Sequence, residues 1–137
     1  MEKYKILICD DSKTVRAKFL EVLKEIEHDY YEIEAFEAGD GQESIDMYKK
    51  LKPDLVFLDI IMPEKTGLEA LEEIVAIENQ TKIIMASSVG TKENLKEALD
   101  IGADDFIQKP LAYRKLKKLI FKLMKRKRLM DRLNKNR

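Results

Sequence analysis

The sequence predicts an α/β protein, with a doubly wound parallel sheet of five strands and five helices on its two faces. Three observations support this fold class. Short apolar runs alternate with stretches of helical apolar spacing five times along the 137 residues. The connections between these stretches are short. The clearest run, Leu-Val-Phe-Leu at residues 55–58, contains no polar residue, which is typical of a strand buried on both faces of a parallel sheet.

The first half of the chain contains two strand and helix units. A buried strand is expected at residues 5–9, and Ser12 is a suitable N-cap for the helix that follows, to about residue 27. Apolar and acidic residues alternate over 31–36, which indicates a strand with one wetter face, at or near a sheet edge. A loop at 38–41 then leads to a short helix that Pro53 closes.

The second half repeats this pattern three times. The strand at 55–58 has ended by Pro63. Beyond it, the sequence predicts a helix at 68–77, a strand at 82–87, a helix at 91–101 and a strand at 105–108. A final helix is expected from residue 111 onward, with no breaker before the end of the chain. Gly102 is the expected terminator of the fourth helix.

Polar side chains follow four of the five expected strands. Asp10 and Asp11 follow the first strand, Asp59 the third and Lys109 the fifth, while Ser87 ends the fourth. Parallel crossovers bring all carboxyl ends to one edge of the sheet, where ligands of open α/β sheets bind. Each motif alone is commonly a cap or a turn. Together they predict one site, with Asp59 placed for chemistry.

The residue types in this cluster indicate phosphoryl chemistry. Three carboxylates that lie close together either raise one another's pKa or hold a divalent cation. Oxygen ligands without His or Cys favour Mg²⁺, or Mn²⁺, over zinc. A lysine and a hydroxyl suit a negatively charged tetrahedral group. No Gly-x-x-x-x-Gly-Lys loop is present to hold a nucleotide, so the acceptor is a side chain, and Asp59 is the best placed.

Several motifs resemble the signature of response-regulator receiver domains. They are Asp10-Asp11, the segment 58–63 (Leu-Asp-Ile-Ile-Met-Pro) with Gly67, the pair Ser87-Ser88, and 102–110 (Gly-Ala-Asp-Asp-Phe-Ile-Gln-Lys-Pro). The resemblance covers roughly residues 4–125. It implies a flavodoxin-like sheet of strand order 2-1-3-4-5.

The resemblance also implies roles for the site residues. Asp59 would accept the phosphoryl group. Asp11, Asp59 and the backbone carbonyl of Ile61 would ligate Mg²⁺, and Asp10 would act mainly through metal-bound water. Lys109 would pair with the phosphoryl group. The peptide bond between Lys109 and Pro110 would be cis.

Two further residues would form the switch. Ser87 would hydrogen-bond a phosphoryl oxygen only in the phosphorylated state, and Phe106 would then turn inward to fill the space behind it. Phe106 stands where receivers use a Tyr or Phe readout, and it has no hydroxyl. The fourth helix, fifth strand and fifth helix would form the face that contacts a downstream protein or output domain.

The lifetime of the phosphoryl group depends on residues that flank the attacking water. The side chains two positions beyond Asp59 and two beyond Ser87 are Ile61 and Val89, both apolar. Neither can orient a water molecule, so a long-lived phosphoryl group is expected.

These observations predict that the protein is a signalling phosphoacceptor and not an enzyme. A histidine kinase or a phosphotransfer protein would phosphorylate it. A metal-dependent phosphohydrolase is the alternative from another class. Such enzymes carry an acid two residues beyond the nucleophile, where this chain has Ile61. A non-phosphorylated pseudo-receiver is a third reading, which the complete acidic cluster argues against.

The charge of the chain is unevenly distributed. Residues 1–113 hold 14 basic and 25 acidic residues, whereas 114–137 hold 12 basic residues and only Asp131 as an acid. We therefore expect a receiver domain at 1–124 and a basic helical extension or linker at 125–137. Alternating three- and four-residue steps give the extension one heptad seam with a charged interruption, formed by Leu116, Leu119, Leu123, Arg126, Met130 and Leu133.

The role of the extension stays open at this point. In one interpretation it is a frayed, solvated end of the last helix. In another, it is part of a helical linker to an output domain, and the chain is the receiver module of a longer regulator. The chain could also act alone, as a chemotaxis or phosphorelay receiver. Phosphorylation-dependent homodimerisation is a further option. Sequence-specific DNA binding is disfavoured, because the run contains no helix-turn-helix and no interleaved aromatics.

The location of the protein follows from what the sequence does not contain. No apolar stretch is long enough to span a membrane, and no signal peptide precedes the first strand. The single cysteine, Cys9, lies in an apolar run and fits a reducing compartment. The expected location is the cytoplasm.

Overall fold

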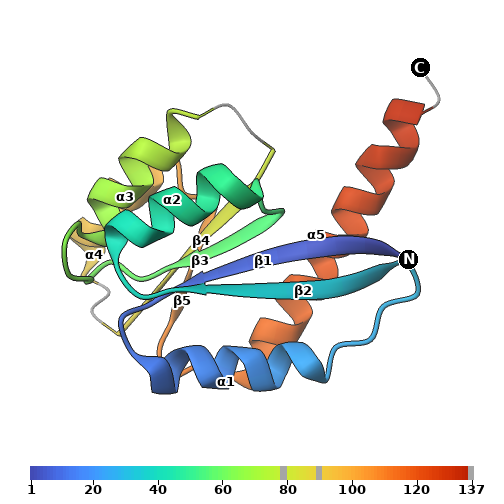
Figure 1. The fold of residues 1–137 in the computed structure, drawn as a ribbon, viewed down its shortest axis with the longest axis horizontal. Helices are drawn as coiled ribbons and strands as arrows, with labels where there is room; N and C mark the ends of the chain where they lie inside the picture. The colour runs from blue at the N-terminus through green and yellow to red at the C-terminus, as the bar shows by residue number, and fades with distance from the viewer. Residues whose placement is uncertain (78–79, 89–90, 136–137) are drawn as a thin grey trace.

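The computed structural model describes residues 1–77, 80–88 and 91–135, and its sheet has the strand order β2-β1-β3-β4-β5 (Figure 1). All four neighbouring pairs are parallel. The fold class and the strand order are therefore confirmed, and β2 is an edge strand as its alternating pattern predicted. The strands are β1 (Glu2–Cys9), β2 (Tyr31–Ala38), β3 (Leu55–Leu58), β4 (Lys82–Ser87) and β5 (Asp105–Gln108).

Five helices connect and follow the strands, and some element bounds differ from those expected. The helices are α1 (Lys13–Lys24), α2 (Gly41–Leu51), α3 (Gly67–Val75), α4 (Lys92–Ile101) and α5 (Tyr113–Lys135). The first strand starts three residues earlier than expected, because Glu2 pairs with Tyr31 of β2 despite its charge. The first helix ends three residues earlier, where the Glu25 N–H bonds to Val22 and Leu23 carbonyls.

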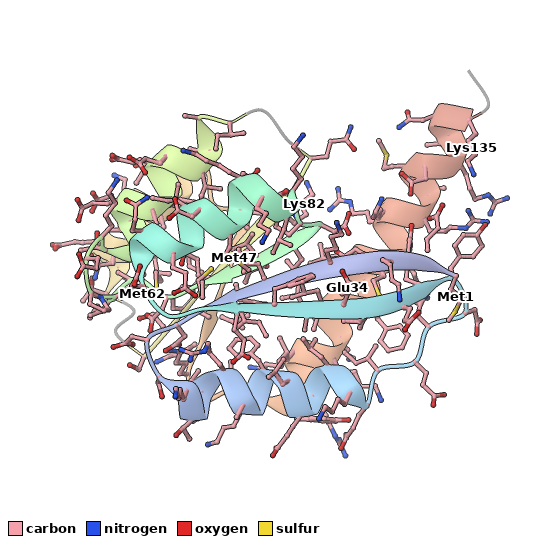
Figure 2. The ribbon with its side chains drawn as sticks, in the orientation of Figure 1. Met1, Glu34, Met47, Met62, Lys82 and Lys135 are labelled. Atoms are coloured by element: carbon pink, nitrogen blue, oxygen red, sulfur yellow. The ribbon has the colours of Figure 1, made fainter. Side chains whose placement is uncertain are left out.

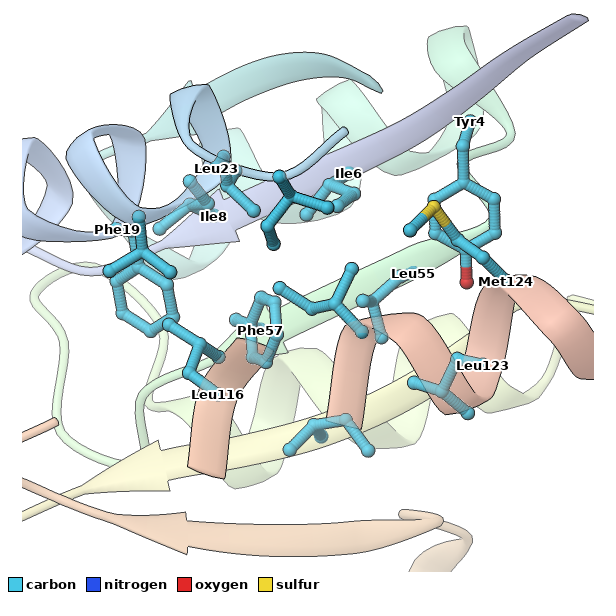
Figure 3. Packing of buried hydrophobic residues seen from close by; sticks show 14 of the residues in the cluster. Tyr4, Ile6, Ile8, Phe19, Leu23, Leu55, Phe57, Leu116, Leu123 and Met124 are labelled. Atoms are coloured by element: carbon cyan, nitrogen blue, oxygen red, sulfur yellow. The ribbon is translucent and has the colours of Figure 1, made fainter. Parts of the chain in front are cut away.

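The sheet is a middle layer between two groups of helices. Helices α1 and α5 lie on one face, and α2, α3 and α4 lie on the other (Figure 1). Successive side chains of β1 alternate between the two faces: Ile6 and Ile8 belong to the cluster under α1 and α5, and Leu7 to the opposite cluster. In the first cluster, Phe19 and Phe57 pack with their ring centroids 4.9 Å apart (Figure 3).

Helix α5 is continuous over its 23 residues and passes residue 125 without a break. Tyr31 Oη donates to Asp131 Oδ2 at 3.2 Å, and Lys127 Nζ lies 3.2 Å from Asp131 and 3.6 Å from Asp54. These contacts attach the extension to the amino-terminal edge of the sheet, and the last described turns reach beyond it to Lys135 (Figure 2).

The expected heptad seam divides into two parts. Leu116 and Leu123 are buried in the body, whereas Met130 and Leu133 are each 53% exposed.

No helix in the described ranges is long and apolar enough to cross a membrane. The division of the chain at residue 124 stays a prediction, because α5 runs through that position without a break.

Candidate functional site

Two aspartates are brought together where β1 and β3 end. The backbone N–H of Asp10 donates to Ala38 O at 3.0 Å, and that of Asp59 donates to Cys9 O at 3.0 Å, so both residues continue the sheet's hydrogen bonding. Their side chains point into one site, although Asp10 is only 2% exposed and Asp59 only 7%. Asp11 is exposed. One carboxylate oxygen from each of the three lies within 4.8 Å of the others.

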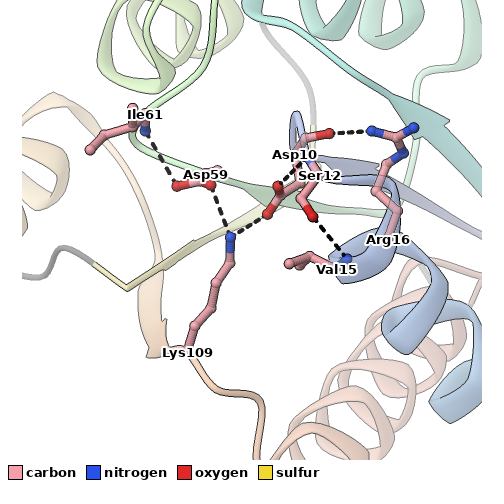
Figure 4. A network of polar contacts seen from close by, with 7 residues as sticks. All are labelled: Asp10, Ser12, Val15, Arg16, Asp59, Ile61 and Lys109. Carbon is pink, nitrogen blue, oxygen red and sulfur yellow. Dashed lines mark hydrogen bonds and ion pairs between the residues drawn. The ribbon is translucent and has the colours of Figure 1, made fainter.

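Lys109, which follows β5, joins the two buried carboxylates (Figure 4). Its Nζ lies 2.9 Å from Asp59 Oδ2 and also forms a short ion pair with Asp10. Burial alone would lower the pKa of Lys109, but the hydrogen bonds to Asp10 and Asp59 outweigh it and raise the pKa above its ordinary value. The side chain is therefore a cation at neutral pH, held against the predicted acceptor.

The residues of the expected switch lie on the neighbouring strands. Ser87 ends β4 with 1% of its surface exposed, and its carbonyl accepts the Lys109 N–H at 3.1 Å. Phe106 in β5 is half-buried and packs against the cluster under α2, α3 and α4. The peptide bond from Lys109 to Pro110 is cis, as expected. Val89, which enters the lifetime prediction, lies outside the described residues.

The segment after Asp59 is fixed by a close backbone contact. The Gly67 N–H donates to Ile60 O at 2.7 Å, and a Cβ on Gly67 would lie 1.7 Å from Asp59 O. Only glycine fits there, so Gly67 allows α3 to begin directly against Asp59. Ile61 donates its N–H to Asp59 Oδ1 at 3.3 Å and leaves 56% of its surface exposed.

These side chains line an open hollow of about 510 Å³. Its walls carry the three aspartates, Ser87, Ser88, Lys18 and Lys109, together with Val15, Ile61 and Leu111. A larger hollow of about 670 Å³ near the start of β4 contains Asp104 and Lys82. The carboxylate cluster, rather than the volume, marks the smaller hollow as the functional one.

The sequence reasoning missed Arg16 of α1. Its Nη1 donates to the Asp10 carbonyl at 2.5 Å, and its Nε donates to Glu37 Oε1 at 3.1 Å. The available signal was a basic residue one turn into the helix that follows the acidic pair. That signal is weak, because α1 also contains Lys13, Lys18 and Lys24.

The cluster fits a hard divalent cation. Within the described residues its donors are all carboxylate oxygens, which suit Mg²⁺ or Mn²⁺. The ammonium group of Lys109 already contacts two of the carboxylates, so the site attracts positive charge. The expected contribution of the Ile61 carbonyl stays a prediction.

Comparisons with known proteins agree with this geometry. A family model for the response regulator receiver domain matches residues 6–121. Protein CcdB of Bacillus subtilis (strain 168) is 39% identical over 120 residues, which are 88% of this chain and 97% of that protein. Chemotaxis protein CheY of Halobacterium salinarum is 43% identical over 105 residues, or 77% of this chain and 83% of that protein.

A solved structure of a chemotaxis complex also contains a chain with a similar fold. A chain in the crystal structure of the CheX-CheY-BeF3-Mg+2 complex from Borrelia burgdorferi superposes with a TM-score of 0.77 and 29% identity. The superposition covers 88% of this chain and 89% of that one.

Proposed function

This chain belongs to the response regulator receiver domain family, and on that basis we propose that it is a phosphoacceptor of a two-component signalling system. Asp59 would receive a phosphoryl group from the phosphohistidine of a histidine kinase or of a phosphotransfer protein. The pairing of buried Asp59 with Lys109 at 2.9 Å, inside a cluster of three carboxylates, carries this proposal.

In the proposed transfer, an Asp59 carboxylate oxygen attacks phosphorus. The new P–O bond forms as the P–N bond of the phosphohistidine breaks. Lys109 already lies against Asp59 Oδ2, and its raised pKa keeps it charged, so it can pair with the arriving phosphoryl oxygens. Positioning and charge neutralisation supply most of the catalytic effect in such a site.

The transfer would require Mg²⁺, with Mn²⁺ as a substitute. Asp11, Asp59 and the Ile61 carbonyl would hold the ion directly, and Asp10 mainly through metal-bound water. When bound, the ion would offset the negative charge of the carboxylates and of the phosphoryl group. Lys109 contacts Asp10 and Asp59, two of the residues that would hold the ion, and its flexible stem would let it turn towards the phosphoryl group.

The phosphorylated state would be read by Ser87 and Phe106. Ser87 is buried beside the Lys109 backbone and lines the same hollow as Asp59, so its hydroxyl would turn towards a phosphoryl oxygen on Asp59. Phe106 is half-buried one strand away and would turn into the space that Ser87 leaves. Because Phe106 has no hydroxyl, the switch would act by packing alone.

The output is proposed to be a change of affinity, with no substrate turnover. The surface formed by α4, β5 and α5 would bind a downstream protein or output domain. A homodimer that forms on phosphorylation is the second form of output. The domain at 1–124 would carry the switch, and the extension at 125–137 would transmit it.

A phosphate mimic tests this function. Beryllofluoride with Mg²⁺ should shift the backbone amide NMR signals of Ser87, Phe106 and Lys109, and Asp59→Asn should abolish those shifts while keeping the fold. Size-exclusion chromatography with light scattering on the same samples separates the two outputs: a dimer in wild type alone supports the homodimer. Identical shifts in wild type and Asp59→Asn would contradict the assignment of Asp59.

A further inference from the structure

Asp10 is held by all four of its polar groups. Its N–H donates to Ala38 O at 3.0 Å, and its carbonyl accepts from Arg16 Nη1 at 2.5 Å. Its Oδ1 accepts the Ser12 N–H at 2.9 Å, and its Oδ2 pairs with Lys109. The neighbouring Asp11 is exposed. The position of the turn that carries both aspartates therefore depends on the contacts of Asp10.

The contact from Arg16 replaces a missing sheet hydrogen bond. Strand β2 ends at Ala38, so no strand residue remains to donate to the Asp10 carbonyl. Arg16 lies one turn into α1 with its side chain only 12% exposed, and it reaches that carbonyl across the end of the sheet (Figure 4). A buried carbonyl without a donor would be costly.

An arginine is required for this geometry. Its planar guanidinium donates to Asp10 with Nη1 and to Glu37 with Nε, two acceptors on two different strand ends. Lysine has the charge but only one nitrogen, and cannot reproduce this fork. Glu37 also offsets the positive charge of Arg16 beside the site, so the guanidinium positions the turn without adding net charge there.

We propose that Arg16 is a positioning residue for the divalent-cation site. It fixes the backbone of Asp10, and through it the turn that presents Asp10 and Asp11 to the ion. Small divalent cations such as Mg²⁺ demand nearly ideal ligand positions, so a displaced turn weakens binding. This inference rests on the proposed function, because it assumes that the carboxylate cluster binds such an ion.

The test measures metal affinity directly, with no phosphorylation step. Mn²⁺ and Mg²⁺ are titrated calorimetrically into the full chain, as wild type, Arg16→Lys and Lys24→Ala. Lys24 is an exposed basic residue at the end of the same helix, and serves as the matched control. Arg16→Lys should weaken binding by about 10- to 100-fold, as is usual when a residue that orients a metal ligand is lost. Lys24→Ala should leave affinity unchanged.

A second variant separates positioning from folding. Arg16→Ala should lose the same affinity, and millimolar guanidinium chloride should restore it where the same concentration of sodium chloride does not. Thermal unfolding without metal shows whether each variant is folded. If Arg16→Lys is too unstable to titrate, Glu37→Ala, which removes one acceptor of the fork, should still weaken binding severalfold.

The outcomes separate this inference from the proposed function. If wild type binds no Mn²⁺, the metal site of the proposed function fails and this inference fails with it. If wild type binds Mn²⁺ and a folded Arg16→Lys binds equally well, only the role of Arg16 is overturned. Equal losses in Arg16→Lys and Lys24→Ala would likewise overturn it, because Lys24 lies at the far end of α1 and its replacement does not touch the contact with Asp10.

Discussion

The carboxylate site combines buried charge with close packing at single residues. Asp10 and Asp59 are almost fully buried, and the single positive charge of Lys109 pairs with both carboxylates. Burying carboxylates in this way is costly without a partner, so the arrangement reflects the need for negative charge at the sheet edge. The backbone around Asp59 is equally constrained, because α3 begins in contact with it.

Gly67 should not tolerate a side chain. A Cβ there would overlap the Asp59 carbonyl at 1.7 Å, whereas a Cβ on Gly39 would have its nearest neighbour, Arg16 Nη1, at 3.6 Å. We expect Gly67→Ala to lower the free energy of unfolding by about 1–3 kcal/mol, the usual cost of overpacking, and Gly39→Ala to change it little. Urea denaturation measures both. Equal stabilities would show that the backbone after Asp59 can move freely.

Ile61 should lengthen the lifetime of the phosphoryl group. Its apolar side chain borders the site hollow and cannot orient an attacking water. We expect a slowly hydrolysed aspartyl phosphate in wild type, and hydrolysis about tenfold faster in Ile61→Asn, which corresponds to roughly 1.4 kcal/mol off the barrier. Loss of the phosphorylated species with time is followed by intact mass. A wild-type half-life of seconds would contradict this prediction.

At the scale of elements, α5 packs on the sheet and also makes contacts beyond it. It starts four residues after Lys109 and ends beyond the opposite edge of the sheet, where Tyr31 and Asp54 contact Asp131 and Lys127. Arg128 stacks over the Tyr30 ring, 3.1 Å from its centroid. The helix therefore connects the edge that carries the carboxylate cluster to a distant surface without a break.

The contact at Asp131 should hold the last turns of α5 in place. Asp131 accepts from Tyr31 and from Lys127, so Asp131→Asn weakens an ion pair and a charge-assisted hydrogen bond. We expect faster hydrogen exchange of the amides over 128–135 and a loss of about 1 kcal/mol in the free energy of unfolding. Arg132→Gln in the same turn is the control. Unchanged exchange in Asp131→Asn would show that packing alone holds α5.

Tyr31 should make this anchor sensitive to alkaline pH. Burial, followed by the nearby Asp131 charge, raises the pKa of the Tyr31 phenol above its ordinary value. The folded state thus binds this proton more tightly than the unfolded state does. The resulting stability is complete below the ordinary tyrosine pKa of about 10 and is lost as pH rises through the raised folded pKa.

Unfolding free energies of wild type and Tyr31→Phe, measured from neutral to alkaline pH, check this expectation. The variant should lose less stability above about pH 10, with the remaining loss due in part to Tyr4, whose pKa burial also raises. Parallel pH curves for the two proteins would contradict the prediction.

At the scale of the whole molecule, the sequence predicted those features that depend on local pattern and topology. Apolar runs located the strands, and parallel crossovers then required Asp10, Asp59, Ser87 and Lys109 to share one edge. The structure brings these four strand ends together. The residue types in the cluster predicted a divalent cation and phosphoryl chemistry with Asp59 as the acceptor, and the family resemblance implied the individual roles of the other residues.

Long-range contacts could not be predicted in the same way. The hydrogen bond between Tyr31 and Asp131 joins residues 100 positions apart, and neither has a distinctive local pattern. Arg16 resembles any other basic residue of a helix until the end of β2 is placed beside it. The early start of β1 at Glu2 likewise depends on pairing with β2, which outweighs the charged residues in its sequence.

The most direct test of the central claim is the intact mass of the chain after incubation with a small phosphodonor such as phosphoramidate. With Mg²⁺ present, wild type should gain the mass of one phosphoryl group, and chelation of the metal should prevent the gain. Asp59→Asn should gain none. Phosphorylation of Asp59→Asn to the same extent, or of wild type without a divalent cation, would contradict the assignment of Asp59 as the metal-dependent acceptor.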